Sequence, residues 1–421
     1  MKRFQTLFSL VAFAIVFSLL SIVFMIPEQI MYASATDGQL SWPMFHHDAS
    51  HSGYTDDLAP NTNNVLWRFK TSGEIDSSPA VVDGRVFFGS RDHSVYCLNA
   101  TTGEQLWSYM TGNQIDASPT VISNSVYIGS NDKYVYCFDA ASGSLQWRHE
   151  LGGPGISSAA LLEGKIYVGC ADNYVYCLNA GTGEQLWKHD TDSWAAAPTV
   201  VDDKVFVGGW VPGHKFSCLN ANDGTEIWSF APRTNIISAS ATVVDGRVFV
   251  GEQSIPGWMY CFDENTGEVL WDYQTELPVA SSPAVVDGRV FVGSNDYNVY
   301  CFDSVNGSVL WRFLTEGPIL SSPAVVDGRV FVGSNDQSVY CIDELTGASV
   351  WNYRTEGSVT SSPAVDGGKL YIGSDDGYIY CFGGGGGFTL SLELIVAAAI
   401  IVIALSFVGI YFYARMRKKK T

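Results

Sequence analysis

The stretch SSPAVVDGRVFVGSNDYNVYCFDSVNGSVLW, Ser281–Trp311, contains short runs of β-branched and aromatic residues separated by turn residues. The runs SPAVV, RVFVG and VYCFD are each five residues long, and VLW begins a fourth, which suits strands better than helices. Asp287 and Gly288 favour a tight hairpin turn, because that turn requires positive φ at both central residues. Asn306 and Gly307 mark another turn. The stretch therefore predicts one four-stranded antiparallel sheet.

This stretch is one copy of a repeat of 40 to 43 residues that spans most of the 421-residue chain. Each copy contributes one tryptophan, and the eight are Trp67, Trp107, Trp147, Trp187, Trp228, Trp271, Trp311 and Trp351. Eight cysteines keep nearly the same spacing: Cys97, Cys137, Cys177, Cys218, Cys261, Cys301, Cys341 and Cys381. Four short antiparallel strands at this period are typical of a propeller blade. We therefore predict an all-β protein with an eight-bladed β-propeller.

The sequence NVLWRFKT at 64–71 has the form of the end of a repeat, although no repeat precedes it. The eighth copy, in turn, stops at Cys381 and Phe382 without its tryptophan strand. We expect the early strand to complete the last blade, so that the propeller spans 64–382. Such a closure leaves no long unpaired strand edge.

The segment YCLNATTGEQLW, Tyr96–Trp107, ends in Trp after a turn glycine and resembles the PQQ-binding-like β-propeller repeat family. The segment Trp42–Thr55, WPMFHHDASHSGYT, is similar to the lead-in that often precedes such propellers. The family includes quinoprotein dehydrogenases, an outer-membrane assembly scaffold and surface proteins. The dehydrogenases typically carry an adjacent Cys-Cys pair and calcium ligands, which cannot be matched here. The resemblance therefore implies a non-enzymatic scaffold without cofactor, with a dehydrogenase using PQQ and calcium as the alternative.

Both ends of the chain are hydrophobic. Lys2 and Arg3 precede an apolar stretch, and ASA at 33–35 is similar to a signal-peptide cleavage site. A second apolar stretch contains no charge and is followed by RMRKKK, which marks the cytoplasmic side. The predicted order is a signal peptide or N-terminal anchor at 1–35, a lead-in at 36–63, the propeller at 64–382, a Gly-rich linker at 383–393, a transmembrane helix at 394–413 and a basic cytoplasmic tail at 414–421.

This order predicts a single-pass protein of the cell membrane with its propeller outside the cytoplasm. The net charge of −19 disfavours nucleic acid as a partner. Eight of the nine cysteines occupy one equivalent position in every blade, where neighbours are too far apart for a disulfide. We expect them, and Cys170, to be buried free thiols.

The repeat is irregular in blades 4 and 5. The glycine that ends the second strand lies ten residues before the cysteine there, against eight in regular blades. The longer loops and the loops leading into these blades should share one face, and their candidate binding residues are Trp194, Trp210, His214, Arg233, Trp258 and Met259. Exposed Trp, Met and Arg are enriched in interface cores. Local packing of longer loops is the alternative interpretation.

Three smaller features have mainly structural interpretations. His46, His47 and His51, with Asp48, are weak metal-ligand candidates in a segment that more simply forms a packed strap. Six aspartates could form a carboxylate ring, but capping of hairpin turns explains them better; they are Asp92, Asp132, Asp172, Asp296, Asp336 and Asp376. Asn306 is the better of two glycosylation candidates.

These observations favour a membrane-anchored, non-catalytic binding scaffold for a protein or glycan partner, with a monomeric propeller. A quinoprotein dehydrogenase and a structural cell-envelope component remain as alternatives.

Overall fold

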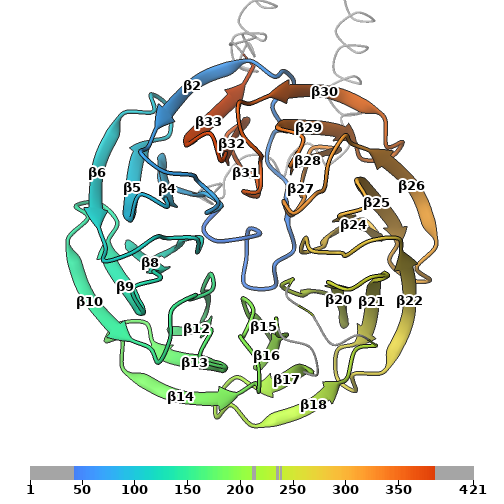
Figure 1. Ribbon diagram of the computed structural model, residues 1–421, viewed down its shortest axis with the longest axis horizontal. Helices are drawn as coiled ribbons and strands as arrows, with labels where there is room; N and C mark the ends of the chain where they lie inside the picture. Colours follow the sequence, from blue (N-terminus) through green and yellow to red (C-terminus); the bar gives the residue numbers. More distant parts are fainter. Residues whose placement is uncertain (1–41, 211–214, 234–236, 238, 385–421) are drawn as a thin grey trace, which may run out of the picture. The chain divides into compact units, whose positions relative to one another are not determined.

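The computed structural model describes residues 42–210, 215–233, 237 and 239–384. Within these ranges the chain forms eight sheets, each with four antiparallel strands, arranged around a central channel, and one of them carries a fifth, parallel strand (Figure 1). This confirms the predicted all-β, eight-bladed propeller. The structure shows no helix, in the part it describes, that is long and apolar enough to cross a membrane. The segments predicted as signal peptide, transmembrane helix and cytoplasmic tail lie outside the described residues.

Each blade runs from an inner strand at the channel to an outer strand at the rim. The inner strands are β3 (Ala80–Val82), β7 (Thr120–Ile122), β11 (Ala160–Leu162), β15 (Thr199–Val201), β19 (Thr242–Val244), β23 (Ala284–Val286), β27 (Ala324–Val326) and β31 (Ala364–Asp366). The second strands are β4 (Arg85–Gly89), β8 (Ser125–Gly129), β12 (Lys165–Gly169), β16 (Lys204–Val207), β20 (Arg247–Glu252), β24 (Arg289–Gly293), β28 (Arg329–Ser334) and β32 (Lys369–Gly373).

The third strands carry the repeated cysteines and the outer strands carry the repeated tryptophans. The third strands are β5 (Ser94–Asn99), β9 (Tyr134–Asp139), β13 (Tyr174–Asn179), β17 (Phe216–Asn220), β21 (Gly257–Asp263), β25 (Asn298–Asp303), β29 (Ser338–Asp343) and β33 (Tyr378–Gly383). The outer strands are β6 (Gln105–Met110), β10 (Leu145–Glu150), β14 (Gln185–Asp190), β18 (Glu226–Phe230), β22 (Val269–Thr275), β26 (Val309–Leu314), β30 (Ser349–Arg354) and β2 (Val65–Lys70). Blades 1 to 8 are numbered from β3 onward.

The last blade is closed by the first long strand of the chain. Strand β2 pairs antiparallel with β33, so that Trp67 lies opposite Cys381 and Val65 opposite Phe382. The order in this sheet is β2-β33-β32-β31, and Figure 1 shows the blue β2 outside the red β33. The predicted closure is therefore confirmed.

The repeated tryptophans join each blade to the next. The indole N–H of Trp67 donates to the Ala100 carbonyl of blade 1 at 3.1 Å, and the six that follow make the equivalent bond to their neighbours. Trp351 is the exception, because its acceptor is the Pro60 carbonyl of the lead-in at 3.4 Å. The lead-in thus supplies a contact that the incomplete last repeat lacks.

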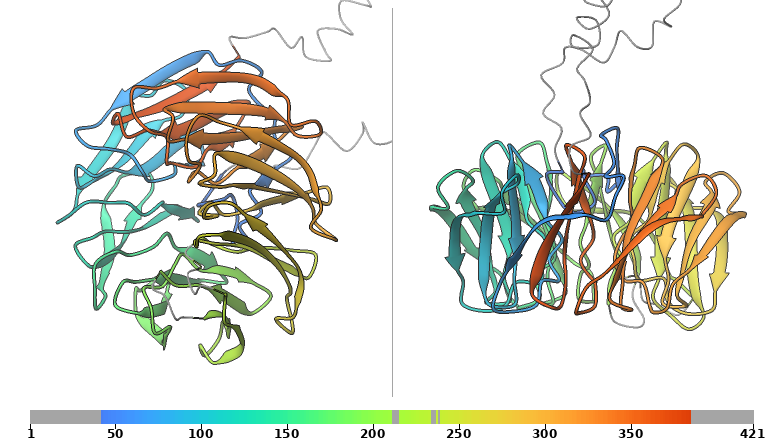
Figure 2. Two further views of the ribbon diagram at one scale, coloured as in Figure 1. Left: turned by 45° about the vertical axis from the view of Figure 1, so that its right-hand side comes forward. Right: turned by 90° about the horizontal axis from the view of Figure 1, so that it is seen from above.

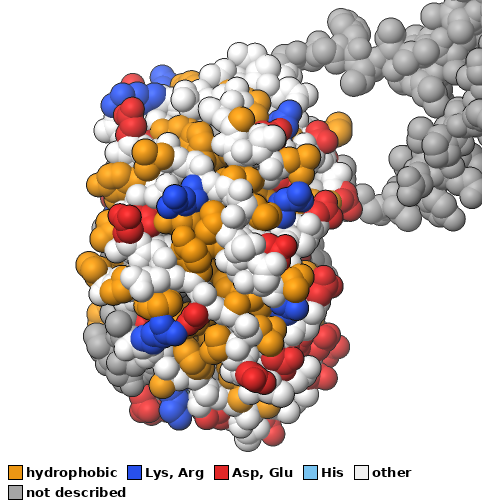
Figure 3. Space-filling view, turned by 90° about the vertical axis from the view of Figure 1, so that its right-hand side faces the viewer, with side chains coloured by type: hydrophobic (Ala, Val, Ile, Leu, Met, Phe, Trp, Pro, Cys, Tyr) orange, Lys and Arg blue, Asp and Glu red, His pale blue; other side chains and the backbone are white. Residues whose placement is uncertain are grey.

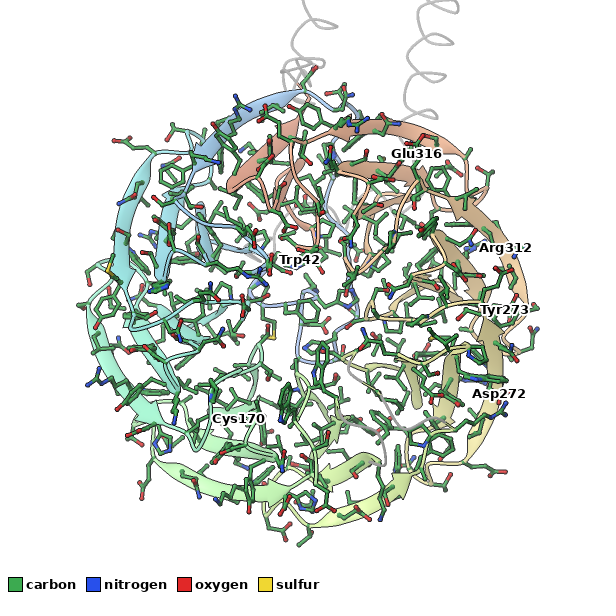
Figure 4. The ribbon with its side chains drawn as sticks, viewed as in Figure 1. Trp42, Cys170, Asp272, Tyr273, Arg312 and Glu316 are labelled. Atoms are coloured by element: carbon green, nitrogen blue, oxygen red, sulfur yellow. The ribbon has the colours of Figure 1, made fainter. Side chains whose placement is uncertain are left out.

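The lead-in also fills one end of the channel, which the sequence did not predict. Carbonyls of residues 42–53 accept the N–H of an equivalent inner-strand residue in six blades; these N–H groups belong to Val81, Val121, Val200, Val243, Val285 and Val325. Strand β1 (Tyr54–Thr55) then pairs parallel with β27. Figure 4 labels Trp42 near the centre of the ring, and its side chain is buried. We call residues 42–55 the plug.

Hydrophobic cores lie between adjacent blades. One such core joins Phe87 and Cys97 of blade 1 to Val121 and Ile128 of blade 2. All nine cysteines are free and buried, as predicted. Burial raises the pKa of the Cys97 thiol to about 12, which leaves it unreactive at neutral pH.

Candidate functional site

Loops at one face of the ring surround a cavity of about 1020 Å³, which we call the funnel. These are the loops between second and third strands, together with the loops that lead into each blade. The opposite face carries the short hairpin turns, so we call the two the funnel face and the turn face; Figure 2 shows the ring edge-on. Phe45 of the plug lines the funnel. The volume lies at the upper end of the range of about 300–1,000 Å³ found for ligand sites.

One wall of the funnel is acidic. Arg91 of blade 1 binds Glu74 at 2.5 Å and Asp116 at 2.9 Å, and it also contacts Asp76. The side-chain amide of Asn131 donates to Asp116 at 2.8 Å. Arg91 is the only Lys or Arg among the funnel-lining residues that the structure describes. Because three carboxylates already hold it, this wall stays negative.

Two carboxyl groups of this wall interact closely. The Thr360 hydroxyl lies 3.3 Å from Asp76 Oδ1 and 3.3 Å from Asp375 Oδ1. Burial raises the pKa of Asp76 to about 7, with Arg91 opposing the rise and the Asp375 carboxyl adding to it. Burial likewise raises the pKa of Asp375. The pair therefore retains a proton close to neutral pH.

Two tryptophans from blade 4 line the funnel as well. Trp194 is 54% exposed and Trp210 is 49% exposed, and both contact the cavity. The Trp210 N–H donates to the Trp194 carbonyl at 3.1 Å, and a bridge between Ala195 and Gly209 holds the two loops together. Blade 4 lies across the ring from blade 8 (Figure 1). The two indoles therefore line a different part of the funnel from the acidic wall.

Three of the other predicted binding residues, Arg233, Trp258 and Met259, do not line the funnel. The Arg233 guanidinium stacks 3.8 Å from the Trp258 ring centroid and bonds to Asp272, which Figure 4 places at the outer edge of the ring. Met259 is fully buried in the core between blades 5 and 6, so it is not available to a partner. His214 lies outside the described residues. The structure thus brings Trp194 and Trp210 together at the funnel, without Arg233, Trp258 or Met259.

A ring of serines lines the funnel from blade to blade. The Ser78 N–H donates to Ser118 Oγ at 2.9 Å, and the same bond recurs from Ser118, Ser240, Ser282, Ser322 and Ser362 to the next blade. Blade 4 carries Ala197 at the equivalent position. Sequence reasoning missed this ring and the acidic wall. The available signal for the serine ring was the repeated Ser-Ser-Pro. The available signal for the acidic wall was Asp76, which precedes this motif in blade 1, and Asp116 at the equivalent position of blade 2.

The six repeated aspartates are turn caps, as the simpler interpretation held. Asp132 Oδ1 accepts the Tyr134 N–H at 3.1 Å, and Oδ2 accepts the Tyr136 hydroxyl at 2.7 Å. The aspartate-to-tyrosine bond occurs in all six regular blades. In blade 5, Glu252 accepts the Tyr260 hydroxyl instead. These carboxylates are therefore used in hydrogen bonds within their own blades and do not form an open ring of free acceptors.

The plug histidines are held by protein groups. His46 Nδ1 lies 2.7 Å from the His51 carbonyl and Nε2 lies 2.9 Å from the Pro323 carbonyl, so both ring nitrogens face backbone oxygens. His51 Nδ1 lies 3.0 Å from Thr199 Oγ1. No cluster of His, Cys, Asp or Glu in the described ranges has the arrangement of a metal site. Asn306 is exposed in its turn, and its glycosylation stays a prediction.

We expect acid to weaken the plug. Burial lowers the pKa of His46 to about 4, from an ordinary value of 6.5, although the carbonyls of His51 and Pro323 oppose this shift. Burial also lowers the pKa of His51 to about 3. Between pH 6.5 and pH 3 the unfolded chain therefore binds more protons at these two histidines than the folded chain does. As the pH drops through this range, the free energy of unfolding falls by on the order of several kcal/mol. Urea unfolding at stepped pH measures this.

The control is the double variant His46→Gln and His51→Gln, whose side chains do not titrate. Its stability at pH 7 is expected to be lower, but its stability should fall less between pH 6.5 and 4 than that of the unmodified protein. An equal fall in both proteins would show that the plug histidines do not carry the acid response.

On the outer rim, by contrast, small groups of hydrophobic side chains alternate with charged ones over the outer strands of the right-hand blades (Figure 3). Leu270 is 44% exposed and Leu310 is 48% exposed, at equivalent positions of β22 and β26. Scattered exposed apolar side chains of this kind are normal on protein surfaces. The funnel is therefore the stronger candidate site.

The fold and the repeat define an eight-bladed propeller of the PQQ-like type. The family model described as outer membrane protein assembly factor BamB matches four overlapping segments, residues 52–155, 131–255, 213–322 and 299–384. The chain belongs to this family. A search of the curated proteins found no match.

Solved structures share the fold at low identity. BamB from Moraxella catarrhalis has a TM-score of 0.65 and 20% identity, over 76% of this chain and 99% of that chain. The computationally designed Ika8 protein has a TM-score of 0.67 and 19% identity, over 78% and 99%. Quinohemoprotein alcohol dehydrogenase from Comamonas testosteroni has a TM-score of 0.68 and 14% identity, over 86% and 83%. At these identities the likeness shows the fold alone.

Proposed function

We propose that this protein is a membrane-anchored, extracytoplasmic scaffold that holds a protein partner at its funnel face without catalysing a reaction. The observation that carries the proposal is the exposed pair Trp194 and Trp210 at the funnel. Tryptophan is among the residues most enriched in binding hot spots. The description of the matching family model names an outer membrane protein assembly factor, and this supports a protein as the partner.

The proposed anchor is connected to one particular face of the propeller. Residues 394–413 are apolar and uncharged, and we propose that they span the membrane with the basic tail inside. Strand β33 is a third strand and ends at Gly383 on the turn face. The chain therefore leaves the propeller from the face opposite the funnel. The proposed anchor therefore leaves the funnel face free of the chain that connects the propeller to the membrane.

The charge of the funnel does not fit the quinone of the dehydrogenase alternative. Pyrroloquinoline quinone is a polycarboxylate, and its binding requires cationic partners. Arg91 is already bound by Glu74, Asp76 and Asp116. A further polyanion beside this wall would be repelled. We therefore propose a scaffold without a quinone cofactor.

Replacing both funnel tryptophans is expected to abolish partner capture. A truncated hot spot typically costs about 2 kcal/mol or more, so the variant Trp194→Ala with Trp210→Ala should lose roughly thirtyfold in affinity per residue. Because both side chains are half exposed, the melting temperature should move little. The measurement is the yield of proteins that co-purify with the full chain from solubilised membranes.

The matched control is Leu345→Ala, which removes an exposed side chain from a hairpin turn of blade 7 on the turn face. Its capture should equal that of the unmodified chain. If the double tryptophan variant still captures the partner, the binding surface lies elsewhere. If neither chain captures any protein, the structural cell-envelope alternative gains support.

A further inference from the structure

The serine ring presents hydrogen-bond donors to the funnel. Six of its hydroxyl oxygens accept an N–H from a neighbouring blade, and five of these six serines are less than a tenth exposed; these five are Ser78, Ser118, Ser282, Ser322 and Ser362. Their hydroxyl hydrogens have no acceptor among the residues that the structure describes, and all five line the cavity. Because these serines line the cavity, their hydroxyls can donate to a ligand bound there. The serine ring therefore suits a ligand that offers acceptor oxygens.

The acidic wall presents the opposite chemistry. Asp116 and Asp76 line the funnel beside Asn131 and Thr360. A carboxylate accepts about four hydrogen bonds. Within the described part of the chain, Asp116, which is 42% exposed, accepts those from Arg91 and Asn131 alone. A ligand at this wall must therefore supply donors. Anionic ligands are excluded, because the wall already contains more carboxylates than Arg91 neutralises.

The tryptophans add flat apolar surface to the same cavity. The indoles of Trp194 and Trp210 are half exposed and come from the irregular loops of blade 4. Aromatic rings pack well against ligands that are apolar on one face and polar at their edges. Ligand sites commonly combine such apolar surface with a few placed polar groups.

We propose that the funnel binds a short neutral oligosaccharide. Each sugar hydroxyl both donates and accepts, so it can serve the carboxylates of the wall and the serine hydroxyls of the ring at once. The C–H face of a sugar ring packs on the indoles. A cavity of about 1020 Å³ suits several linked sugars better than a single one. This inference goes beyond the protein scaffold proposed above and does not depend on it.

Calorimetry on the purified full chain tests the proposal, in a detergent without sugar groups. The probes are the neutral trisaccharides maltotriose, cellotriose and tri-N-acetylchitotriose, with trigalacturonate as an anionic trisaccharide of similar size. At least one neutral probe is expected to bind and to quench tryptophan fluorescence, whereas trigalacturonate is expected not to bind. Failure of all three neutral probes, or preferential binding of trigalacturonate, would overturn the proposal.

Variants locate the site. Trp210→Ala, Asp116→Ala and Ser282→Ala should each weaken binding of the neutral probe by roughly tenfold or more. Ala197 already occupies the serine position in blade 4, so the fold tolerates alanine there. Asn131→Ala is a second variant of the wall if Asp116→Ala unfolds. The control Leu345→Ala should bind normally.

The outcome is independent of partner capture. Binding of the probe with full affinity by Trp210→Ala and Asp116→Ala would overturn the site assignment. If no sugar binds while the double tryptophan variant loses its protein partner, this inference fails and the scaffold stands. If a sugar binds and no protein is captured, the inference stands and the scaffold fails.

Discussion

A chain that begins at Gly73 is expected to aggregate or to lose its cooperative unfolding transition. It lacks β2, so the edge of β33 in blade 8 is left unpaired. It also lacks the plug, whose carbonyls accept six inner-strand N–H groups, and the Pro60 acceptor of Trp351. Unpaired strand edges are templates for association with other chains. Calorimetry and light scattering of the propeller measure both effects.

The comparison chain begins at Thr36 and keeps the plug and β2. A third chain that begins at Leu58 removes the plug but keeps Pro60 and β2. We expect this third chain to fold with reduced stability, because the ring is closed but the channel groups are exposed to water. If the chain from Gly73 melts as the chain from Thr36 does, the first strand does not close the ring.

Replacing Trp67 by alanine is expected to lower the free energy of unfolding by about 3–5 kcal/mol, as for other removals of large packed aromatics. The indole joins blade 8 to blade 1 through its N–H bond to Ala100. Its ring also packs on Gly103 of blade 1 and lies 5.9 Å, centroid to centroid, from Tyr371. Chemical denaturation with constant m-value measures the loss.

A pair of glycine variants tests the same contact from the other side. Gly103 and Gly84 both have positive φ, at 72° and 68°. A Cβ on Gly103 would lie 2.6 Å from the Trp67 ring, whereas a Cβ on Gly84 would meet nothing within 4 Å. Both Ala variants incur backbone strain of about 1 kcal/mol, but only Gly103→Ala also displaces the indole. Equal losses in the two variants would contradict the proposed docking of Trp67.

The repeat made the blades and the closure predictable. Strands that recur at a constant period are expected to pair in the same way in every blade. The unmatched NVLWRFKT could therefore be assigned to the outer-strand position that the eighth repeat lacks. The plug was not predictable in this way, because it bonds through its backbone carbonyls, and these leave no pattern in the side chains. Its most buried side chains among the described residues are Trp42, Met44, His46 and His51, and burial of this kind is seen only once the structure is known.

The candidate site was predictable only in part. Blade 5 uses its extra residues to lengthen a hairpin, so that β20 extends to Glu252 and β21 begins at Gly257. The alternation of a strand then directs Met259 into the core, although the sequence suggested an exposed loop. The acidic wall joins residues of blades 8, 1 and 2, whose contact depends on the closed ring rather than on any local motif.

A photo-crosslinking residue placed at two positions tests the central claim, that the funnel face holds the partner. One full chain carries it in place of Trp210 and the other in place of Leu345, both in the native membrane. The account predicts a specific protein adduct from position 210 and none from position 345. Adducts from position 345 alone, or the same adducts from both positions, would contradict it.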